Sequence, residues 1–276
     1  MAKQRLDMYL VESGLCESRQ LAQRVIRAGE VQVNQVVIDK PGTLIKPDAT
    51  VLVKQKSRFV SRGGEKLAKA LEVFGVEVCD RICLDGGIST GGFTDCLLQA
   101  GARQVYGVDV GYGQVAWKLR QDPRVVLKER TNIRHLTQSD LYSETQPHPD
   151  LGVMDVSFIS LTKVLPAFWA LLAPPREAIL LIKPQFEVGR DKIGKKGVVR
   201  DPRHHTEAIE TVLNMSQHLG WQYRGLTWSP LVGPAGNIEY LLWLSAKATN
   251  ETATPTTETI ADIAKTARKT LQSPDL

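Results

Sequence analysis

The chain has 276 residues, of which 42% are hydrophobic, and a formal net charge of +5 at pH 7. This length suggests two domains or one large one, and the composition is typical of a soluble protein with a sizeable core. No apolar run approaches the ~20 residues of a membrane span, no apolar signal segment follows the charged N-terminus, and the cysteines form no CxxC pair. We therefore expect a cytoplasmic protein without a membrane span, a disulfide framework or a zinc site.

Residues 1–59 are predicted to form a small α+β domain. Apolar spacing indicates a helix that ends at Gly14 and a second helix that is capped by Ser18 and ends at Gly29. Alternating residues then predict two successive strand pairs. Between residues 3 and 58 there are ten Lys and Arg against six Asp and Glu, which gives this fifth of the chain a charge of about +4. Such a basic surface is what binding to several phosphates requires.

This first segment resembles the S4 RNA-binding domain along its whole length. The matching residues are Arg5-Leu6-Asp7, Ser18-Arg19, the AxxxIxxGxVxVN run at 22–34, and Lys40-Pro41-Gly42. The resemblance implies an RNA-facing surface that includes Arg5, Arg19, Arg24 and Lys40. A basic face that docks another protein is the alternative interpretation.

A larger domain, predicted at residues 60–246, is organised around the stretch 83–101. An apolar run reaches Asp85, a burst of glycines follows, and a helical pattern then ends at Gly101. A strand, a glycine-rich turn and a helix in this order open a nucleotide-binding α/β unit, in which glycines admit the ligand and the helix start favours an anion. The next apolar run ends on Asp109, which is placed to accept hydrogen bonds from ribose hydroxyls.

The glycine spacing indicates which nucleotide is bound. Gly86-Gly87 and Gly91-Gly92 are separated by three residues, which is not GxGxxG; this counts against NAD or FAD and suits the looser loop of S-adenosylmethionine enzymes. A purely structural turn is the alternative. The residues predicted to bind this cofactor are Asp85, Gly86, Gly87, Ser89, Thr90, Gly91, Gly92, Phe93, Asp109, Asn132 and Asp155.

Strands and helices alternate through the rest of this domain. Helices are predicted from residue 65 and at 115–120, 161–172 and 202–219, and strands at 125–127, 151–155, 178–182, 223–229 and 240–244. This order predicts a doubly wound, Rossmann-like α/β sheet, and the closing strand pair fits a methyltransferase. Residues 247–276 are expected to form a polar tail, disordered at 251–259, with a short helix at 260–271.

Polar side chains follow several of the predicted strands. Asn132 is placed to read an adenine edge or to cap a turn. Asp155 ends a strand and is expected to point into the ligand crevice. Lys183 also ends a buried strand, where desolvation is costly, so it needs a functional reason unless it snorkels to solvent; Pro184 makes snorkelling less favoured.

Basic residues outside the first domain are also candidates for RNA binding. The loop at 189–197 carries several cations among three glycines, and it either covers a substrate backbone or is a solvated loop. Arg62 lies in a glycine-containing, hinge-like segment before the predicted helix. The candidates are Arg62, Arg190, Lys195 and Lys196.

Four widely separated residues converge in the predicted fold, and we call them the tetrad: Lys66, Asp155, Lys183 and Glu239. Their contexts SRGGEKL, MDVSFISL, LIKPQFE and GNIEYLL strongly resemble the FtsJ-like ribose 2′-O-methyltransferases. With the S4-like segment in front, the chain up to about residue 245 resembles the TlyA family. The resemblance implies methyl transfer from S-adenosylmethionine to a ribose 2′-hydroxyl of cytidine in ribosomal RNA, with rRNA or ribosomal subunits as partners.

The chemistry explains these residue types. A ribose hydroxyl is a poor nucleophile and the sulfonium methyl is already activated, so most of the work is alignment and the removal of one proton. We expect Lys183 to contact the hydroxyl, either as a base or as a positioning cation, and Asp155 and Glu239 to hold the two lysines. No metal is required, and the tetrad lacks His and Cys ligands. A non-RNA substrate and a haemolysin-like membrane activity are the alternatives, and the oligomeric state is left open.

Overall fold

The computed structural model describes residues 3–53, 58–143, 146–247 and 253–271. The chain divides into two compact units, Met1–Ser57 and Arg58–Leu276. No helix in the described ranges is long and apolar enough to cross a membrane.

Unit 1 packs two helices against short strands. Its elements are β1 (Gln4–Arg5), α1 (Leu6–Glu12), α2 (Arg19–Arg27), β2 (Val31–Val33), β3 (Val36–Val37), β4 (Leu44–Ile45) and β5 (Val51–Val53). The Ser18 Oγ accepts a hydrogen bond from the Leu21 N–H, which confirms the predicted cap of α2. The helices bury Leu6, Leu10 and Ile26 in one core.

The predicted second strand pair of unit 1 is wrong. β4 pairs with β1, while β5 pairs with β2, so the two strands of the expected pair lie in different sheets. Alternation fixes which side chains are buried but not the partner strand, and burial of Ile45 and Val31 in the shared core selects these pairings.

Unit 2 is a seven-stranded sheet in the order β11-β12-β10-β9-β6-β7-β8. The strands are β6 (Ile82–Gly86), β7 (Gln104–Val108), β8 (Val125–Lys128), β9 (Leu151–Met154), β10 (Glu177–Ile182), β11 (Gln222–Trp228) and β12 (Tyr240–Ser245). The pairs among β8, β7, β6, β9 and β10 are parallel, whereas β12 and β11 close the sheet antiparallel. The predicted strands and the closing strand pair are confirmed.

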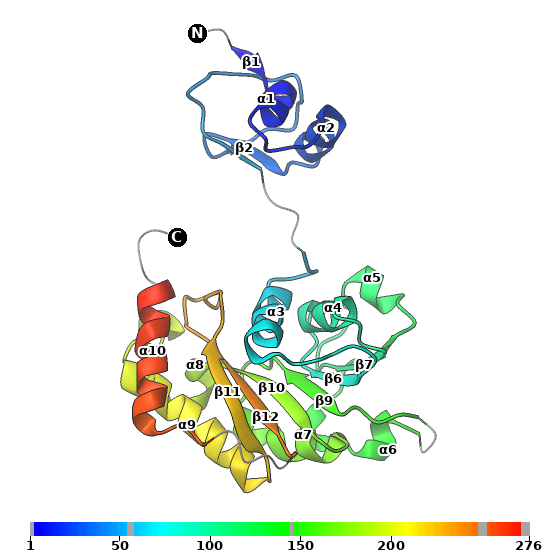
Figure 1. Ribbon diagram of the computed structural model, residues 1–276, viewed down its shortest axis with the longest axis vertical. Helices are drawn as coiled ribbons and strands as arrows, with labels where there is room; N and C mark the ends of the chain where they lie inside the picture. The colour runs from blue at the N-terminus through cyan, green and yellow to red at the C-terminus, as the bar shows by residue number, and fades with distance from the viewer. Residues whose placement is uncertain (1–2, 54–57, 144–145, 248–252, 272–276) are drawn as a thin grey trace. The chain divides into compact units, whose positions relative to one another are not determined.

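Helices cover both faces of this sheet (Figure 1). The helices are α3 (Gly63–Phe74), α4 (Gly92–Gln99), α5 (Trp117–Arg120), α6 (Gln138–Leu141), α7 (Leu165–Leu171), α8 (Pro184–Glu187), α9 (Pro202–His218) and α10 (Thr257–Leu271). Alternate residues of β10 enter different cores: Ile179 packs with α3 and α4, and Leu180 packs with α7, α9 and α10. This is the doubly wound arrangement expected from the sequence.

Two predicted helices differ from the structure. The expected helix at 161–172 is split into a 3₁₀ turn, Leu161–Lys163, and α7, because Pro166 has no N–H to continue the first helix and instead occupies the first turn of the second. The helix expected from residue 115 begins at Trp117, since Ala116 is extended.

The C-terminal helix is longer than expected. Residues 257–259, expected to be disordered, form the first turn of α10, while residues 251 and 252 lie outside the described ranges. Ile260, Ala264 and Ala267 of α10 are buried in the same core as α9. Burial of this apolar stripe outweighs the polar composition of the turn before it.

Candidate functional site

Three tetrad residues lie at one edge of the sheet of unit 2. Asp155 follows β9, Lys183 follows β10, and Glu239 precedes β12. β9 and β10 are parallel and β12 runs antiparallel to them, so these three positions meet at the same edge. The pairing of Ile182 with Tyr240 sets Lys183 next to Glu239 across two neighbouring strands.

The tetrad forms two ion pairs, of which Lys66–Glu239 is buried and Lys183–Asp155 is partly exposed at Asp155. The Lys66 Nζ, which reaches the edge from α3, lies 2.5 Å from the Glu239 Oε2, and the Lys183 Nζ lies 2.6 Å from the Asp155 Oδ1. Both lysines are only 8% exposed and Glu239 is 1% exposed. Such burial of charge is tolerated only when each charge is paired, so the carboxylates hold the two ammonium groups in place.

The four tetrad side chains line one cavity of about 310 Å³. Gly87, Thr90, Gly92, Phe93 and Arg62 line the same cavity, so parts of the glycine loop and the segment before α3 face the tetrad. Near its wall, a Cβ at Gly233 would lie 2.8 Å from the Glu239 Oε1, which explains the glycine there. The structure therefore brings the predicted lysines and carboxylates together beside the glycine loop.

A second cavity, of about 440 Å³, adjoins the first. Gly87, Ser89, Asp155 and Ser157 line both cavities, so the two spaces meet between the glycine loop and the segment after β9. A Cβ at Gly87, where φ is +86°, would lie 2.7 Å from the Asp155 carbonyl oxygen; only glycine fits this close approach.

The second cavity has the lining that a nucleoside requires. The Asp109 carboxylate accepts hydrogen bonds from the N–H groups of Ser89 and Gly111, which fix its orientation. The Asn132 Oδ1 accepts from the Arg134 N–H, so Asn132 caps a turn and lines the cavity at once. The remaining lining is largely apolar: Val108, Val110, Ile133, Val156, Ile159 and Val164.

Asp85, Gly86 and Gly91 line neither cavity. Asp85 is fully buried, and its Oδ2 accepts a hydrogen bond from the Thr94 hydroxyl at 2.7 Å. Burial raises the pKa of Asp85 to about 7, opposed by the Thr94 hydrogen bond and reinforced by the charge of Asp155. Its other oxygen is buried without a partner among the described residues. The position of Asp85 behind the loop is that of a group that holds α4.

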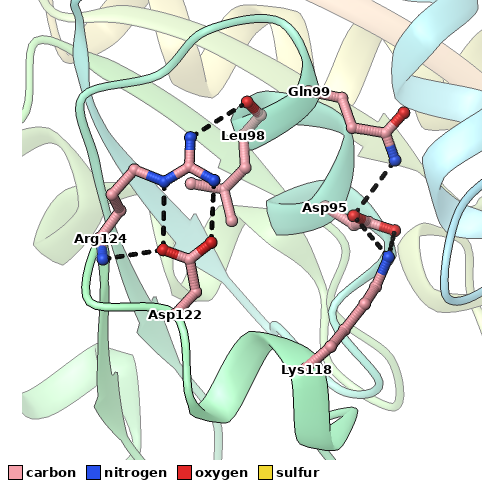
Figure 2. Close-up of polar contacts among 6 residues, drawn as sticks. All are labelled: Asp95, Leu98, Gln99, Lys118, Asp122 and Arg124. Atoms are coloured by element: carbon pink, nitrogen blue, oxygen red, sulfur yellow. Dashed lines mark hydrogen bonds and ion pairs between the residues drawn. The ribbon is translucent and has the colours of Figure 1, made fainter.

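A polar network fixes α4 against its neighbours (Figure 2). The Asp95 carboxylate accepts from the Lys118 Nζ and the Gln99 side chain, and Arg124 pairs with Asp122 while donating to the Leu98 carbonyl. Asp95 also accepts from the Val60 N–H at 2.8 Å. The helix that carries the glycine loop is thus attached to the beginning of unit 2.

The sequence did not single out two residues of the segment after β9. The Ser157 Oγ accepts a hydrogen bond from the Lys183 Nζ at 2.7 Å. Phe158 is 93% exposed, has φ +65°, and lies 5.4 Å from the ring of Phe186 at the margin of the second cavity. A large apolar side chain that is exposed beside a cavity suggests a binding role. The sequence does not show this exposure, because Phe158 belongs to a largely apolar run of residues.

The predicted RNA-facing residues of unit 1 fall into two groups. Arg5 and Arg19 both pair with the buried Asp7, and the Arg5 hydrogen bonds hold the pKa of Asp7 well below its usual range. Arg24 and Lys40 are exposed. In unit 2, Arg190, Lys195 and Lys196 are exposed in the loop after α8, and Lys195 and Lys196 line a third cavity.

Comparisons with known proteins agree on both units. Residues 59–246 match the model of the FtsJ-like methyltransferases, and residues 4–51 match that of the S4 domain. YqxC of Bacillus subtilis is 52% identical over 88% of this chain and 85% of its own length. The 16S/23S rRNA (cytidine-2′-O)-methyltransferase TlyA of Mycobacterium tuberculosis is 47% identical over 87% of this chain and 89% of its own. A solved structure from Streptococcus thermophilus, provisionally called a hemolysin, is 42% identical with a TM-score of 0.73, covering 98% of this chain and 97% of that one.

Proposed function

Because the chain belongs to the TlyA family of FtsJ-like methyltransferases with an S4 domain, we propose that it transfers a methyl group from S-adenosylmethionine to the 2′-hydroxyl of a cytidine in ribosomal RNA. The observation that carries the proposal is a cavity lined by two lysine–carboxylate pairs that opens beside a nucleoside-sized cavity. Ribosomal RNA as the substrate implies that the protein acts in the cytoplasm.

The residues of the second cavity fit S-adenosylmethionine. The oriented carboxylate of Asp109 suits the two ribose hydroxyls, and the Asn132 amide suits the adenine edge. The apolar lining suits the face of the base, and Gly87 leaves room for the chain that leads to the tetrad cavity. When bound, this cofactor supplies an activated methyl group on a sulfonium centre.

Lys183 is the group that contacts the 2′-hydroxyl. An ammonium group has three N–H donors. One of those on Lys183 is directed to the Ser157 Oγ at 2.7 Å, and an ion pair at 2.6 Å holds the ammonium group beside Asp155, so a donor remains for the sugar oxygen. Two fixed partners restrict the rotation of a flexible side chain, so the substrate oxygen is held in one position relative to the methyl donor. Ser157 acts through Lys183 as a positioning residue.

Lys66 and Glu239 line the same cavity. Glu239 has one carboxylate oxygen on Lys66 and holds that ammonium group at the cavity surface. The positive charge favours the oxygen as its proton passes to the partly exposed Asp155 carboxylate, while Glu239 keeps the buried charge of Lys66 balanced. In unit 1, the exposed Arg24 and Lys40 contact RNA phosphates. Arg5 and Arg19 also contact phosphates, through the guanidinium N–H groups that are not bonded to Asp7.

The test is methyl transfer from labelled S-adenosylmethionine to deproteinised rRNA, ribosomal subunits and assembled ribosomes, followed by nucleoside analysis. We expect 2′-O-methylcytidine in at least one of these substrates. Label on a base, on a protein or on a small molecule would reject the proposal. A variant that lacks residues 1–57 distinguishes an RNA substrate from a small-molecule substrate. Methyl transfer to RNA should fall sharply in this variant, whereas methyl transfer to a small molecule would be retained.

A further inference from the structure

A third cavity, of about 340 Å³, lies in unit 2 beside the tetrad cavity. It is bounded by the loop at 195–200, the start of α9, the start of β12, and α10. Ala235 and Gly236 line it, while Pro234 and Glu239 of the same short loop line the tetrad cavity. The two cavities are therefore separated by the loop that carries Glu239.

The lining of this third cavity is strongly cationic. It includes Lys195, Lys196, Arg200 and Arg268, and no Asp or Glu lines it among the residues that the structure describes. Two carboxylates close in sequence to its lining residues form ion pairs elsewhere: Asp201 with Arg203, and Glu207 with Lys192. Like charges gathered around one hollow repel one another, and an anion bound in the hollow relieves that repulsion.

The walls of the cavity are held in place by buried hydrogen bonds. Asn237, only 1% exposed, accepts from the Val199 N–H at 2.9 Å and donates to the Gly197 carbonyl at 2.8 Å. The His205 Nε2 donates to the Val199 carbonyl, and its Nδ1 accepts from the Tyr240 hydroxyl at 2.9 Å. Asn237 and His205 thus fasten the lysine-bearing loop to the strand that follows Glu239. The backbone that carries these cations is therefore fixed before binding, which lowers the entropic cost of binding.

We propose that this cavity binds a backbone phosphate of the RNA that presents its ribose to the tetrad, an inference that rests on the proposed function. Lys and Arg side chains recognise phosphate through charge-assisted hydrogen bonds. A nucleic-acid strand carries one phosphate per nucleotide, so a strand with a ribose at the tetrad has phosphates on both sides of it. The cavity across the Glu239 loop is placed to take one of these, and Arg268 brings α10 into the RNA-binding surface.

The experiment measures binding of unmodified 16S and 23S rRNA transcripts by the full chain at several salt concentrations. Arg268→Gln should weaken binding about tenfold, the effect of one charge-assisted hydrogen bond. Its slope of log K against log salt should become shallower by about 0.7–0.9, the value for one lost phosphate contact. Arg268→Lys should retain most of the affinity. The matched control is Lys265→Gln on the same helix, because Lys265 is exposed, pairs with Asp262 and does not line the cavity.

Separate measurements test the phosphate site and the methyltransferase function. Methyl transfer by the wild type tests the function, and the melting temperature and cofactor binding of each variant test its folding. An Arg268→Gln variant that folds, binds the cofactor and has the wild-type RNA affinity and salt slope would overturn the phosphate site. Equal weakening by Lys265→Gln would do the same. Inorganic phosphate that binds the wild type but not Arg268→Gln, while RNA affinity is unchanged between them, would identify a free-anion site and also overturn the proposal.

Discussion

Replacement of Asp85 by Asn tests whether this buried carboxyl has a raised pKa that makes the stability of unit 2 depend on pH. Asp85 is fully buried, with one oxygen on Thr94, and its pKa is raised from 3.8 to about 7, chiefly by burial. The folded chain therefore binds this proton more tightly than the unfolded chain does. The stabilising contribution is fully present below about pH 3.8 and is lost as the pH rises through about 7.

The magnitude follows from the two pKa values. Their difference corresponds to about 4 kcal/mol, of which about 3 kcal/mol is lost between pH 5 and pH 8. Asn keeps an acceptor for Thr94 but does not ionise, so Asp85→Asn should gain stability relative to the wild type by about 3 kcal/mol across this interval, roughly 6–10 °C in melting temperature. Other titrating groups largely cancel in the difference between the two proteins.

The assay is denaturant unfolding of both proteins from pH 5 to pH 8, followed by a signal from unit 2 and without added cofactor. Asp122→Asn is the control, because the Arg124 hydrogen bond lowers the pKa of Asp122 and it stays ionised throughout this range (Figure 2). Its stability difference from the wild type should not change with pH. A pH-independent difference for Asp85→Asn would refute the description of Asp85 as a buried carboxyl with a raised pKa.

Three further predictions concern charge pairs and an exposed ring. Glu239→Gln should lower the unfolding free energy of unit 2 by about 3–5 kcal/mol, because it leaves the Lys66 ammonium buried without a carboxylate; the double variant with Lys66→Met should lose clearly less than the sum, as urea unfolding would reveal, and strict additivity would contradict the pairing. Phe158→Ala should reduce the methyl-transfer rate with a stability change within about 0.5 kcal/mol, since the ring is exposed beside the cofactor cavity and available for stacking; an unchanged rate would argue against that role. Arg5→Ala should lower the melting temperature of unit 1, because buried Asp7 loses its bidentate partner, whereas Arg24→Ala should weaken RNA binding at unchanged melting temperature; the reverse pattern would exclude this division of roles.

The sheet of unit 2 could be predicted from the sequence because its strands are apolar runs that end abruptly. β7 ends at Val108, directly before Asp109 as predicted, and Asp155 and Lys183 lie at strand ends because a charge stops a buried run. The split of the helix at Pro166 could also be anticipated, since proline marks a first turn. The helix α10 was predicted at 260–271, but its first turn at 257–259 was not, because the burial of Ile260 depends on contact with α9, which composition does not encode.

The residues of the site could be predicted from the sequence, but the hydrogen bonds and ion pairs between their side chains could not. The tetrad positions follow from their contexts, whereas the hydrogen bond from Lys183 to Ser157 depends on how the chain turns after β9. In the same way, the charge of Arg5 and Arg19 predicts RNA contact, and only the fold reveals that both hold Asp7. Long-range partners are chosen by tertiary packing, so local patterns cannot specify them.

The central claim is that Lys183 positions the ribose oxygen for methyl transfer. The most direct measurement is the single-turnover rate of 2′-O-methylcytidine formation on an rRNA substrate by Lys183→Ala, with Lys163→Ala as an exposed control that lines neither cavity. We expect Lys183→Ala to lower the rate by at least about 100-fold, with cofactor and RNA binding retained, and Lys163→Ala to remain near the wild type. A Lys183→Ala rate equal to that of the wild type would contradict the account.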